Sequence, residues 1–379
     1  MSHGSWTEFL VFSALKIVGV FAVLMFIVAY AVWVERKVSA AIQDRVGPNR
    51  VGPFGLLQPI ADAVKSFLKE DFTPGHVRKT YYWLAPAIVM IPSLLTVAII
   101  PFGSMLGAQK MVIADLNVGI LYTFGIVSLG VYGIVLAGYA ANSKYPFLGG
   151  IRSSAQMISY EIAMGMSVVP LFLIVGGLRL SEVVEYQSVS LSHWLIFRQP
   201  LSFIIFMVAM FAETNRLPFD LPESEQELAG GYNVEYSSMK FALFFMGEYA
   251  AMTVASAMMV TLFLGGWSLP IAGLNQPATT IGLGLLHIGI FLAKMLIVEF
   301  MIIWVRWMWP RFRYDQLMDL GWRRFIPLAL ANIVVTALVL WGAKAMETAP
   351  AKESSPPRLV TTGVALDLRK SSAVARHDC

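Results

Sequence analysis

Four glutamates lie inside or at the end of long apolar segments, where an ionised side chain is costly. Glu35 closes the first apolar segment, Glu161 lies in the fourth, Glu213 ends the fifth and Glu248 lies in the sixth. Charged residues in such places usually face the interior of a helix bundle or a water-filled cavity, and many of them carry protons or ions. Any one of the four could instead be a structural partner of a cation or a backbone group. As a set, they predict a hydrated proton path.

A lysine lies deep in the seventh apolar segment. Counted back from the end of that segment at roughly 1.5 Å per residue, Lys294 is about 17 Å down, near the middle of a bilayer. We therefore expect Lys294 to belong to the proton path. Glu299 is a weaker candidate, because it lies about 140° around the helix from Lys294 and the two are not same-face partners.

A second concentration of acids follows the fifth apolar segment, in a loop over residues 214–239. Pro218, Pro222 and the pair Gly230-Gly231 brace this loop. Carboxylates that share a helix turn repel each other and titrate as a coupled group. We expect a loop that changes shape when its charge changes, with a solvated acidic loop as the alternative. Its candidate coupling residues are Asp220, Glu223, Glu225, Glu227, Glu235 and the cation Arg216.

The elements that position these residues follow from the composition, which argues against a water-soluble enzyme. Of 379 residues, 57% are hydrophobic and 14% charged, and the mean hydropathy is +0.66. Apolar runs of about 20 residues cross a bilayer. The sequence predicts an all-α integral membrane protein with about eight transmembrane helices. The predicted spans lie near 9–34, 83–102, 117–139, 155–177, 200–213, 240–264, 280–305 and 325–345.

Basic residues alternate between the loops and predict the topology. Most Lys and Arg residues lie in the first, third, fifth and seventh loops, so by the positive-inside rule these loops face the cytoplasm. Both termini are then on the opposite, periplasmic side. The net charge of +4 and the pI near 9.0 indicate this topology and not nucleic-acid binding. No basic region precedes the first apolar run, so we expect a retained span there and not a signal peptide.

The first cytoplasmic loop contains an amphipathic helix, predicted over residues 54–69. Leu57, Ile60, Val64 and Leu68 recur at helical spacing, and polar residues occupy another face. The helix is too polar to span a membrane. It either rests in the headgroup region or forms the wall of an entrance for a lipid-like substrate.

The composition changes after residue 346. The remaining segment is rich in Pro, Ser and scattered charge, and such a segment buries too little apolar surface to fold. We expect residues 1–346 to form one polytopic membrane domain and residues 347–379 to be a disordered tail.

Metal-binding residue types are scarce. The single cysteine is Cys379, and the five histidines are scattered without metal-ligand spacing. This pattern argues against a disulfide framework, a thiolate metal site, a Cys-ligated iron–sulfur cluster and a haem site in this chain. We expect the chain to bind no metal or redox cofactor of its own.

Several longer motifs resemble a known family. They are ERK (35–37), QDRVGPNRVG (43–52), IADAVK (60–65) with KED (69–71), SAQMISYE (154–161), the loop from Glu213 to Tyr236, and RYDQLM (313–318). Together they closely resemble the H-subunit family of the proton-pumping NADH:quinone oxidoreductases, respiratory complex I. The resemblance runs from about Phe9 to Trp341.

The resemblance implies a membrane subunit of an H⁺-translocating enzyme in the bacterial inner (cytoplasmic) membrane, lying under a quinone-reducing peripheral arm. Quinone is the substrate. The flavin mononucleotide (FMN), the iron–sulfur clusters and the NADH belong to partner subunits. The implied partners are the peripheral-arm subunits, the neighbouring antiporter-like membrane subunits, quinone and the lipid bilayer, and no nucleic acid.

The resemblance also assigns residues. It implies that the chain forms most of the membrane-side wall of a quinone chamber, whose entrance lies between the first span, the amphipathic helix and neighbouring helices. The matching chamber positions are Arg36, Phe54, Lys65, Glu35, Glu213 and Glu227. Glu161, Glu213 and Glu248 match a chain of carboxylates that leads from the chamber toward the antiporter-like subunits. The acidic loop matches a segment that rearranges with quinone occupancy.

Three other functions fit parts of the pattern. The nearest is the homologous subunit of a membrane-bound hydrogenase or a ferredoxin-driven complex. A stand-alone cation or proton transporter would also place ionisable groups on several spans. A passive membrane anchor explains least, because it gives no reason for so many ionisable groups in the membrane.

Overall fold

The computed structural model describes residues 6–107, 109–220, 231–271 and 273–348. The chain divides into two compact units, residues 1–338 and 339–379. The second unit contains the end of helix α14 (Ile326–Thr348). The expected tail lies outside the described residues apart from its first two positions, and so do Glu223, Glu225 and Glu227 of the acidic loop.

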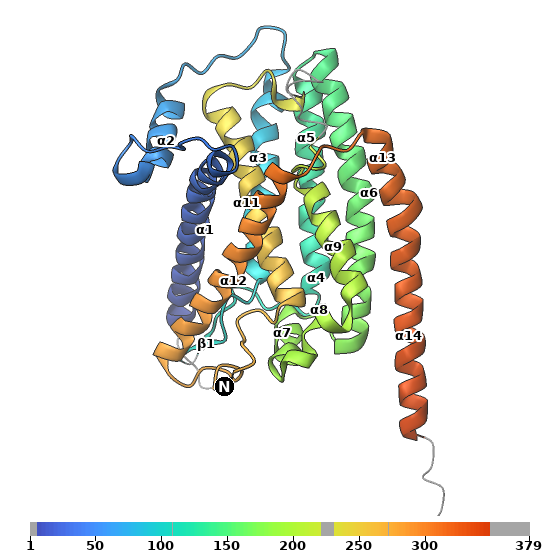
Figure 1. The fold of residues 1–379 in the computed structure, drawn as a ribbon. Helices are drawn as coiled ribbons and strands as arrows, with labels where there is room; N and C mark the ends of the chain where they lie inside the picture. The colour runs from blue at the N-terminus through green and yellow to red at the C-terminus, as the bar shows by residue number, and fades with distance from the viewer. Residues whose placement is uncertain (1–5, 108, 221–230, 272, 349–379) are drawn as a thin grey trace, which may run out of the picture. The chain divides into compact units, whose positions relative to one another are not determined.

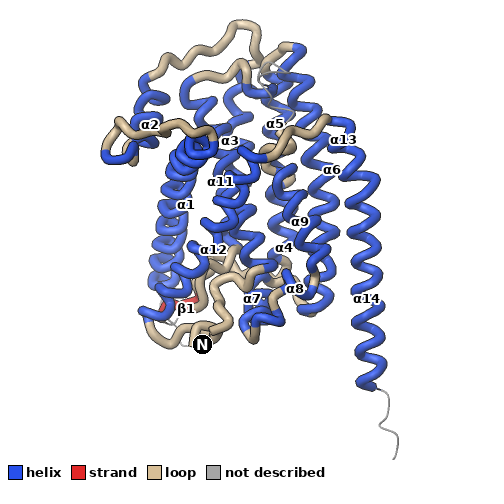
Figure 2. Tube along the Cα trace, in the orientation of Figure 1, coloured by secondary structure: helices blue, strands red, loops and turns tan. Residues whose placement is uncertain are grey.

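The first unit is a bundle of long helices (Figures 1 and 2). In a lipid environment every backbone N–H and C=O needs an internal partner, so apolar runs of this length fold as helices. The bundle is formed by α1 (Trp6–Ile42), α3 (Lys79–Thr96), α4 (Gly119–Val127), α5 (Leu129–Ala140), α6 (Lys144–Val175), α9 (Pro200–Glu213), α11 (Ser238–Phe263), α12 (Ile281–Met308) and the start of α14.

Short elements lie at the two ends of the bundle (Figure 1). One end carries α2 (Gln58–Leu68), the turns η1 (Pro53–Gly55) and η4 (Gly231–Asn233), and α13 (Tyr314–Asp319), which continues through the π-helical turn η5 (Leu320–Phe325) into α14. The opposite end carries η2 (Val97–Ile99), α7 (Leu180–Ser188), η3 (Leu191–His193), α8 (Leu195–Arg198) and a small antiparallel pair, β1 (Met105–Leu106) with β2 (Gln109–Lys110).

Seven helices of the described chain are long and apolar enough to cross a membrane, and α9 is a shorter apolar helix. Together they correspond to the eight segments expected from hydropathy. The chain is therefore an all-α, multi-pass membrane protein.

The helices differ in extent from the expected spans. The first helix continues to Ile42, beyond the expected end at residue 34. The helix expected over 155–177 begins at Lys144, so Glu161 lies near the middle of α6 and not in its first turns. Hydropathy misses the start of α6 because Lys144 and Arg152 lower the mean hydropathy of that segment, which also holds Pro146 and the pair Gly149-Gly150. A proline in the first turn of a helix is tolerated, since that N–H has no helical partner.

Close helix contacts explain two glycines of α5. A Cβ atom on Gly133 would lie 2.6 Å from a side-chain carbon of Val89 on α3. A Cβ atom on Gly138 would lie 2.6 Å from the carbonyl oxygen of Pro146 on α6. Small residues let helix backbones approach in this way. They hold α3, α5 and α6 together beside the candidate site.

Helix α2 (Gln58–Leu68) lies within the segment 54–69 in which an amphipathic helix was expected, and it begins four residues later than expected. Its residues Ile60, Val64, Phe67 and Leu68 expose their apolar side chains. Phe54, in the preceding turn, is 78% exposed and has a φ of 55°. The chain therefore presents an uncovered apolar surface at this end of the bundle.

Candidate functional site

Charged side chains from three helices and one loop meet inside the bundle. Helix α1 supplies Glu35, α11 supplies Glu248, α12 supplies Arg306, and the loop after α9 supplies Arg216. We call these four residues the ion cluster. Arg216 is 1% exposed; its Nε lies 2.8 Å from Oε1 of Glu248 and its Nη1 lies 3.6 Å from Oε2 of Glu35. Arg306 forms an ion pair with Oε1 of Glu35. Two carboxylates therefore face two guanidinium groups.

Tyr249 joins the ion cluster from the next position on α11. Its hydroxyl donates a hydrogen bond to Oε2 of Glu35 at 2.6 Å. The guanidinium carbon of Arg216 lies 4.1 Å from the centre of the Tyr249 ring. A cation over an aromatic face is attracted by the ring quadrupole, and more strongly where water is excluded. Tyr249 thus fixes both Glu35 and Arg216.

A tight turn at the end of α9 positions Arg216. Asn215 has a φ of 47°, a left-handed conformation that Asn tolerates better than most residues. The buried amide of Gln156 on α6 donates to the carbonyls of Ala212 and Phe219, both at 2.9 Å. Because these carbonyls lie on either side of Arg216, Gln156 fixes the turn to α6.

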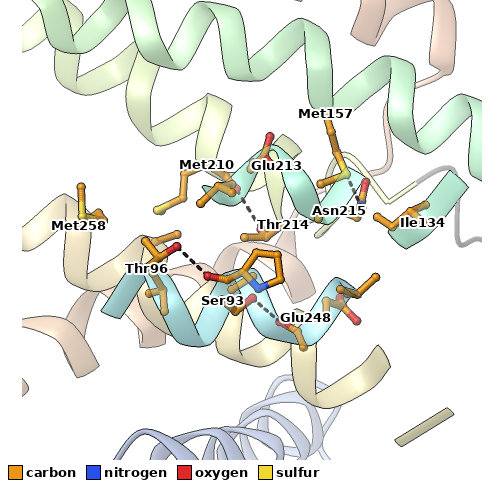
Figure 3. Close-up of a pocket in the computed structure, with 18 of the residues that line it drawn as sticks. Ser93, Thr96, Ile134, Met157, Met210, Glu213, Thr214, Asn215, Glu248 and Met258 are labelled. Carbon is orange, nitrogen blue, oxygen red and sulfur yellow. Dashed lines mark hydrogen bonds between the residues drawn. The ribbon is translucent and has the colours of Figure 1, made fainter. Parts of the chain in front are cut away.

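A cavity lies beside the ion cluster, between α3, α4, α5, α6, α9 and α11. Its volume is about 110 Å³, and Figure 3 shows Glu213 on the α9 side and Glu248 on the α11 side. Glu213 is 9% exposed, and neither of its carboxyl oxygens has a hydrogen-bond partner among the described residues. Glu161 on α6 is close enough to Glu213 for an electrostatic interaction. We call this space the glutamate cavity.

A larger groove of about 580 Å³ lies between α1, α2 and α11. Apolar side chains of α1 and α11 form most of its walls, and Arg36, Asp62 and Lys65 line it from α1 and α2. Arg36 pairs with Asp62 at 2.7 Å, and the ammonium of Lys65 lies 3.9 Å from the same carboxylate. Tyr249 also lines this groove. The Tyr249 side chain therefore contacts both the groove and the ion cluster.

Two residues of the acidic loop pair outside the ion cluster. Asp220 lies 3.4 Å from Arg311, which follows α12, and Glu235 lies 3.7 Å from the ring of His76. Arg216, from the same loop, lies inside the ion cluster. The described parts of the loop are thus tied to different elements of the bundle.

Lys294 does not join the carboxylates. Its ammonium donates to the carbonyls of Leu264 (2.7 Å), Gly266 (3.1 Å) and Ser268 (2.6 Å), beyond the C-terminal end of α11. Its nitrogen lies 4.5 Å from the centre of the Trp194 ring. A cation at this position interacts favourably with the negative end of the helix dipole. The arrangement is that of a brace on the end of α11.

The sequence analysis did not single out two residues of the site, Arg306 and Tyr249, and it ranked Glu299 as a weaker candidate. Glu299, set aside because it does not face Lys294, accepts a hydrogen bond from Thr253 at 3.0 Å. The available signal was the helical spacing of Arg306 and Glu299, which lie seven positions and two turns apart on one face of α12.

Within the described ranges, no group of three or more His, Cys, Asp or Glu residues is arranged to hold a metal ion. The site consists of carboxylates, guanidinium groups and a phenol. Such groups can bind a polar ligand head and can take up or release protons.

The sequence is similar to known proteins over most of its length. A family model described as NADH dehydrogenase matches residues 15–337. An H subunit of the NADH-quinone oxidoreductase of Cytophaga hutchinsonii is 48% identical over 336 residues, which cover 87% of this chain and 96% of that protein. An H subunit from Syntrophobacter fumaroxidans is 49% identical over 346 residues (90% and 99%), and the H subunit from Rickettsia typhi is 50% identical over 329 residues (86% and 93%).

Proposed function

The chain belongs to the H-subunit family of the NADH-quinone oxidoreductases, and we propose that it is the membrane subunit that couples quinone reduction to proton translocation in such an enzyme. In this role it forms a wall of the quinone chamber and the start of a proton path. The chain supplies no redox centre. FMN, the iron–sulfur clusters and the NADH site are contributed by partner subunits of the peripheral arm.

The groove between α1, α2 and α11 is the proposed membrane-side part of the quinone chamber. Ligand pockets are mostly apolar, with volumes of about 300–1,000 Å³ and a few convergent polar groups. The groove, with a volume of about 580 Å³, fits this description, since Arg36 and Lys65 lie at an otherwise largely apolar wall. The exposed apolar face of α2 and Phe54 then lie at the entrance from the lipid.

The observation that carries the proposal is the position of Tyr249. It lines the groove and donates its hydroxyl proton to a hydrogen bond with Glu35 of the ion cluster. A change of charge or hydrogen bonding in the groove therefore reaches Glu35, and Arg216 connects Glu35 to Glu248. Reduction of a quinone to a quinol consumes protons and supplies such a change.

The glutamate cavity continues the proposed path. Glu248 lines it on one side and Glu213 on the other, and Glu161 lies near Glu213. The cavity is large enough to hold water, which needs about 15 Å³ per molecule by this measure, and the two carboxylates are suitable polar partners. The acids of the loop, including Glu223, Glu225 and Glu227, are proposed to respond to quinone occupancy and to link the chamber to this path.

The proposed partners follow from the same role. The end of the bundle that carries α2 and α13 faces the cytoplasm and the peripheral arm, and the helices around the glutamate cavity contact antiporter-like membrane subunits. The enzyme lies in the bacterial inner membrane, with both termini of this chain on the periplasmic side.

Affinity purification of the tagged chain from gently solubilised membranes tests the proposal. We expect flavin, iron–sulfur and antiporter-like subunits to co-purify, identified by mass spectrometry, with inhibitor-sensitive NADH:quinone activity. Recovery with a nickel–iron hydrogenase would instead identify the chain as the homologous subunit of a membrane-bound hydrogenase. Recovery alone in a transport-competent form would overturn the proposal.

A further inference from the structure

Glu299 on α12 is a buried carboxyl group that the proposed path does not use. We propose that Glu299 is a proton-storage residue: it holds a proton in the resting enzyme, gives it to Glu35 of the ion cluster, and is then reprotonated through the same cluster. The inference rests on the proposed function and adds a residue to its coupling site.

Glu299 lies deep between α11 and α12. It is 3% exposed; one oxygen accepts a hydrogen bond from Thr253 at 3.0 Å, and Oε2 has no hydrogen-bond partner among the described residues. A buried ionised carboxylate is costly unless it is paired and fully hydrogen-bonded. Arg216 is near enough for an electrostatic interaction, and among the described residues it forms ion pairs with Glu248 and Glu35.

The charges of the four ion-cluster residues balance without Glu299. Glu35 and Glu248 contribute two negative charges, and Arg216 and Arg306 contribute two positive charges. Lys294 on α12 is bonded to backbone carbonyls beyond the end of α11, and Lys16 on α1 donates to the carbonyls of residues 110 and 112. With Glu299 neutral and protonated, the ion cluster and Glu299 together carry zero net charge.

Helix α11 connects Glu299 to the ion cluster. Thr253, which bonds Glu299, and Tyr249, which bonds Glu35, are four positions apart and lie on one face of α11. Side chains at this spacing are about 5–6 Å apart, a gap that one bridging water can span. The Thr253 hydroxyl also donates to the Tyr249 carbonyl at 2.9 Å, so it has two alternative acceptors.

On the other side of Thr253, the described residues offer few groups that could pass a proton on. A cleft of about 300 Å³ bordered by α1, α11 and α12 reaches Thr253, and its remaining lining side chains are apolar except for Lys16. Apolar walls hold water poorly, because they offer it no hydrogen-bond partners. A proton leaving Glu299 therefore moves toward Glu35, and the residue is a side branch of the path and not a step through the membrane.

The transfer conserves protons and charge. The O–H bond of Glu299 breaks and an O–H bond forms on Glu35, so one carboxyl group replaces the other and the net charge of the five groups stays zero. When Glu35 then passes this proton to the groove, the group carries one excess negative charge. That charge draws a replacement proton from the glutamate cavity by way of Glu248.

The variant Glu299→Gln tests the inference in membranes that hold the complete enzyme. Glutamine has the shape of the protonated acid and cannot release a proton. We expect normal assembly and normal NADH oxidation with a water-soluble artificial acceptor. NADH:quinone turnover should fall about 10²-fold, the lower end of the effect of losing a proton-transfer group. Redox-induced infrared difference spectra should lose a carboxylic-acid band.

Two further variants complete the experiment. Glu299→Asp keeps an ionisable group. It should restore part of the turnover, and its infrared difference spectrum should show the carboxylic-acid band at a shifted frequency. Glu182→Gln, at a half-exposed acid of α7 paired with Arg179 at 3.8 Å, is the matched control and should resemble the wild type.

Three results would overturn the inference. Unchanged turnover and an unchanged band in Glu299→Gln would show that Glu299 does not exchange a proton. Failure of this variant to assemble would show that Glu299 is needed as a fixed charge. Loss of turnover with the band retained would indicate a positioning role only. Failure of the proposed function is separate, because it would appear in the wild-type purification as the absence of NADH:quinone activity.

Discussion

Helix α11 contacts one polar cluster in its N-terminal half and another around its C-terminal end, and the two clusters differ in what their side chains bind. In its N-terminal half, Glu248 and Tyr249 bind Arg216 and Glu35, which are ionisable side chains. Beyond its C-terminal end, Lys294 donates to three backbone carbonyls. There, Gln187 donates to the Thr261 carbonyl at 3.0 Å and accepts from the Gly265 N–H at 3.1 Å. We call Lys294 and Gln187 the C-terminal clamp.

The difference separates a structural cluster from the proposed proton-handling site. A backbone carbonyl does not gain or lose a proton near neutral pH, so the C-terminal clamp has one stable set of bonds. In the ion cluster each proton taken up by a carboxylate changes the pairing that the two guanidinium groups prefer. Both regions place charges where they are costly. The group that each charged side chain binds, and not its depth in the membrane, indicates whether the side chain has a structural role or a proposed role in proton transfer.

Arg216→Met should have the largest effect, because it leaves Glu248 without its 2.8 Å partner. Removing one partner of a buried ion pair costs about 3–5 kcal/mol. We expect little assembled enzyme on native gels and quinone reductase activity near background. Arg323→Met is the control: its exposed pair with Asp319, at 3.5 Å, contributes less than about 1 kcal/mol and should assemble normally. Normal quinone reductase activity of Arg216→Met would contradict the proposed difference in role between the ion cluster and the C-terminal clamp.

Lys294→Met should have the next largest effect, on stability alone. It removes three charge-assisted hydrogen bonds from the end of α11 and should cost about 2–3 kcal/mol. We expect a lower thermal-inactivation midpoint for the assembled enzyme. The ratio of protons translocated to NADH oxidised should stay at the wild-type value. A variant that assembles and turns over but translocates fewer protons would place Lys294 in the proton path. That is the role expected from its position deep in the seventh apolar segment.

The helices were largely predictable from the sequence, because backbone hydrogen bonding in lipid leaves few alternatives for a long apolar run. The start of α6 was not, because Lys144 and Arg152 lower the mean hydropathy of a segment that packs closely against α5. The short elements α7, α8 and the β1–β2 pair lie in loops whose composition carries no strong periodicity.

The site was predictable only in part. The cost of a buried charge singled out Glu35, Glu213 and Glu248, and the structure brings Glu35 and Glu248 together through Arg216. Periodicity gives the face of a residue but not its neighbour on another helix. Tyr249 and Arg306 were missed for this reason, since tyrosine and arginine are common near the ends of spans.

Tyr249→Phe should have a moderate effect, on turnover and not on assembly. It removes a 2.6 Å hydrogen bond to Glu35, and a hydrogen bond to a charged group contributes about 1.5–3 kcal/mol, which corresponds to at least a tenfold loss of quinone turnover. Tyr236→Phe is a matched control, because both tyrosines line the groove. Burial raises the pKa of Tyr236, and its hydroxyl has no hydrogen-bond partner among the described residues.

Steady-state kinetics with a short-chain quinone distinguish the two tyrosine variants. Tyr236→Phe should keep the wild-type kcat and KM, and Tyr249→Phe should lose kcat. Equal losses in both variants would mean that the groove needs its hydroxyl groups for packing or solvation. The link between the groove and the ion cluster would then have to pass through another residue.

Lys65→Met should have the smallest effect. Lys65 is 73% exposed, and its ammonium lies 3.9 Å from Asp62, whereas Arg36 holds the same carboxylate at 2.7 Å. An exposed pair of this kind contributes less than about 1 kcal/mol, so assembly and thermal inactivation should not change. If Lys65 contacts the quinone head at the groove, the KM for quinone should rise a few-fold while kcat stays constant. A fall in kcat with constant KM would instead make Lys65 part of the proton-handling region and extend that region from the ion cluster to the exposed face of α2.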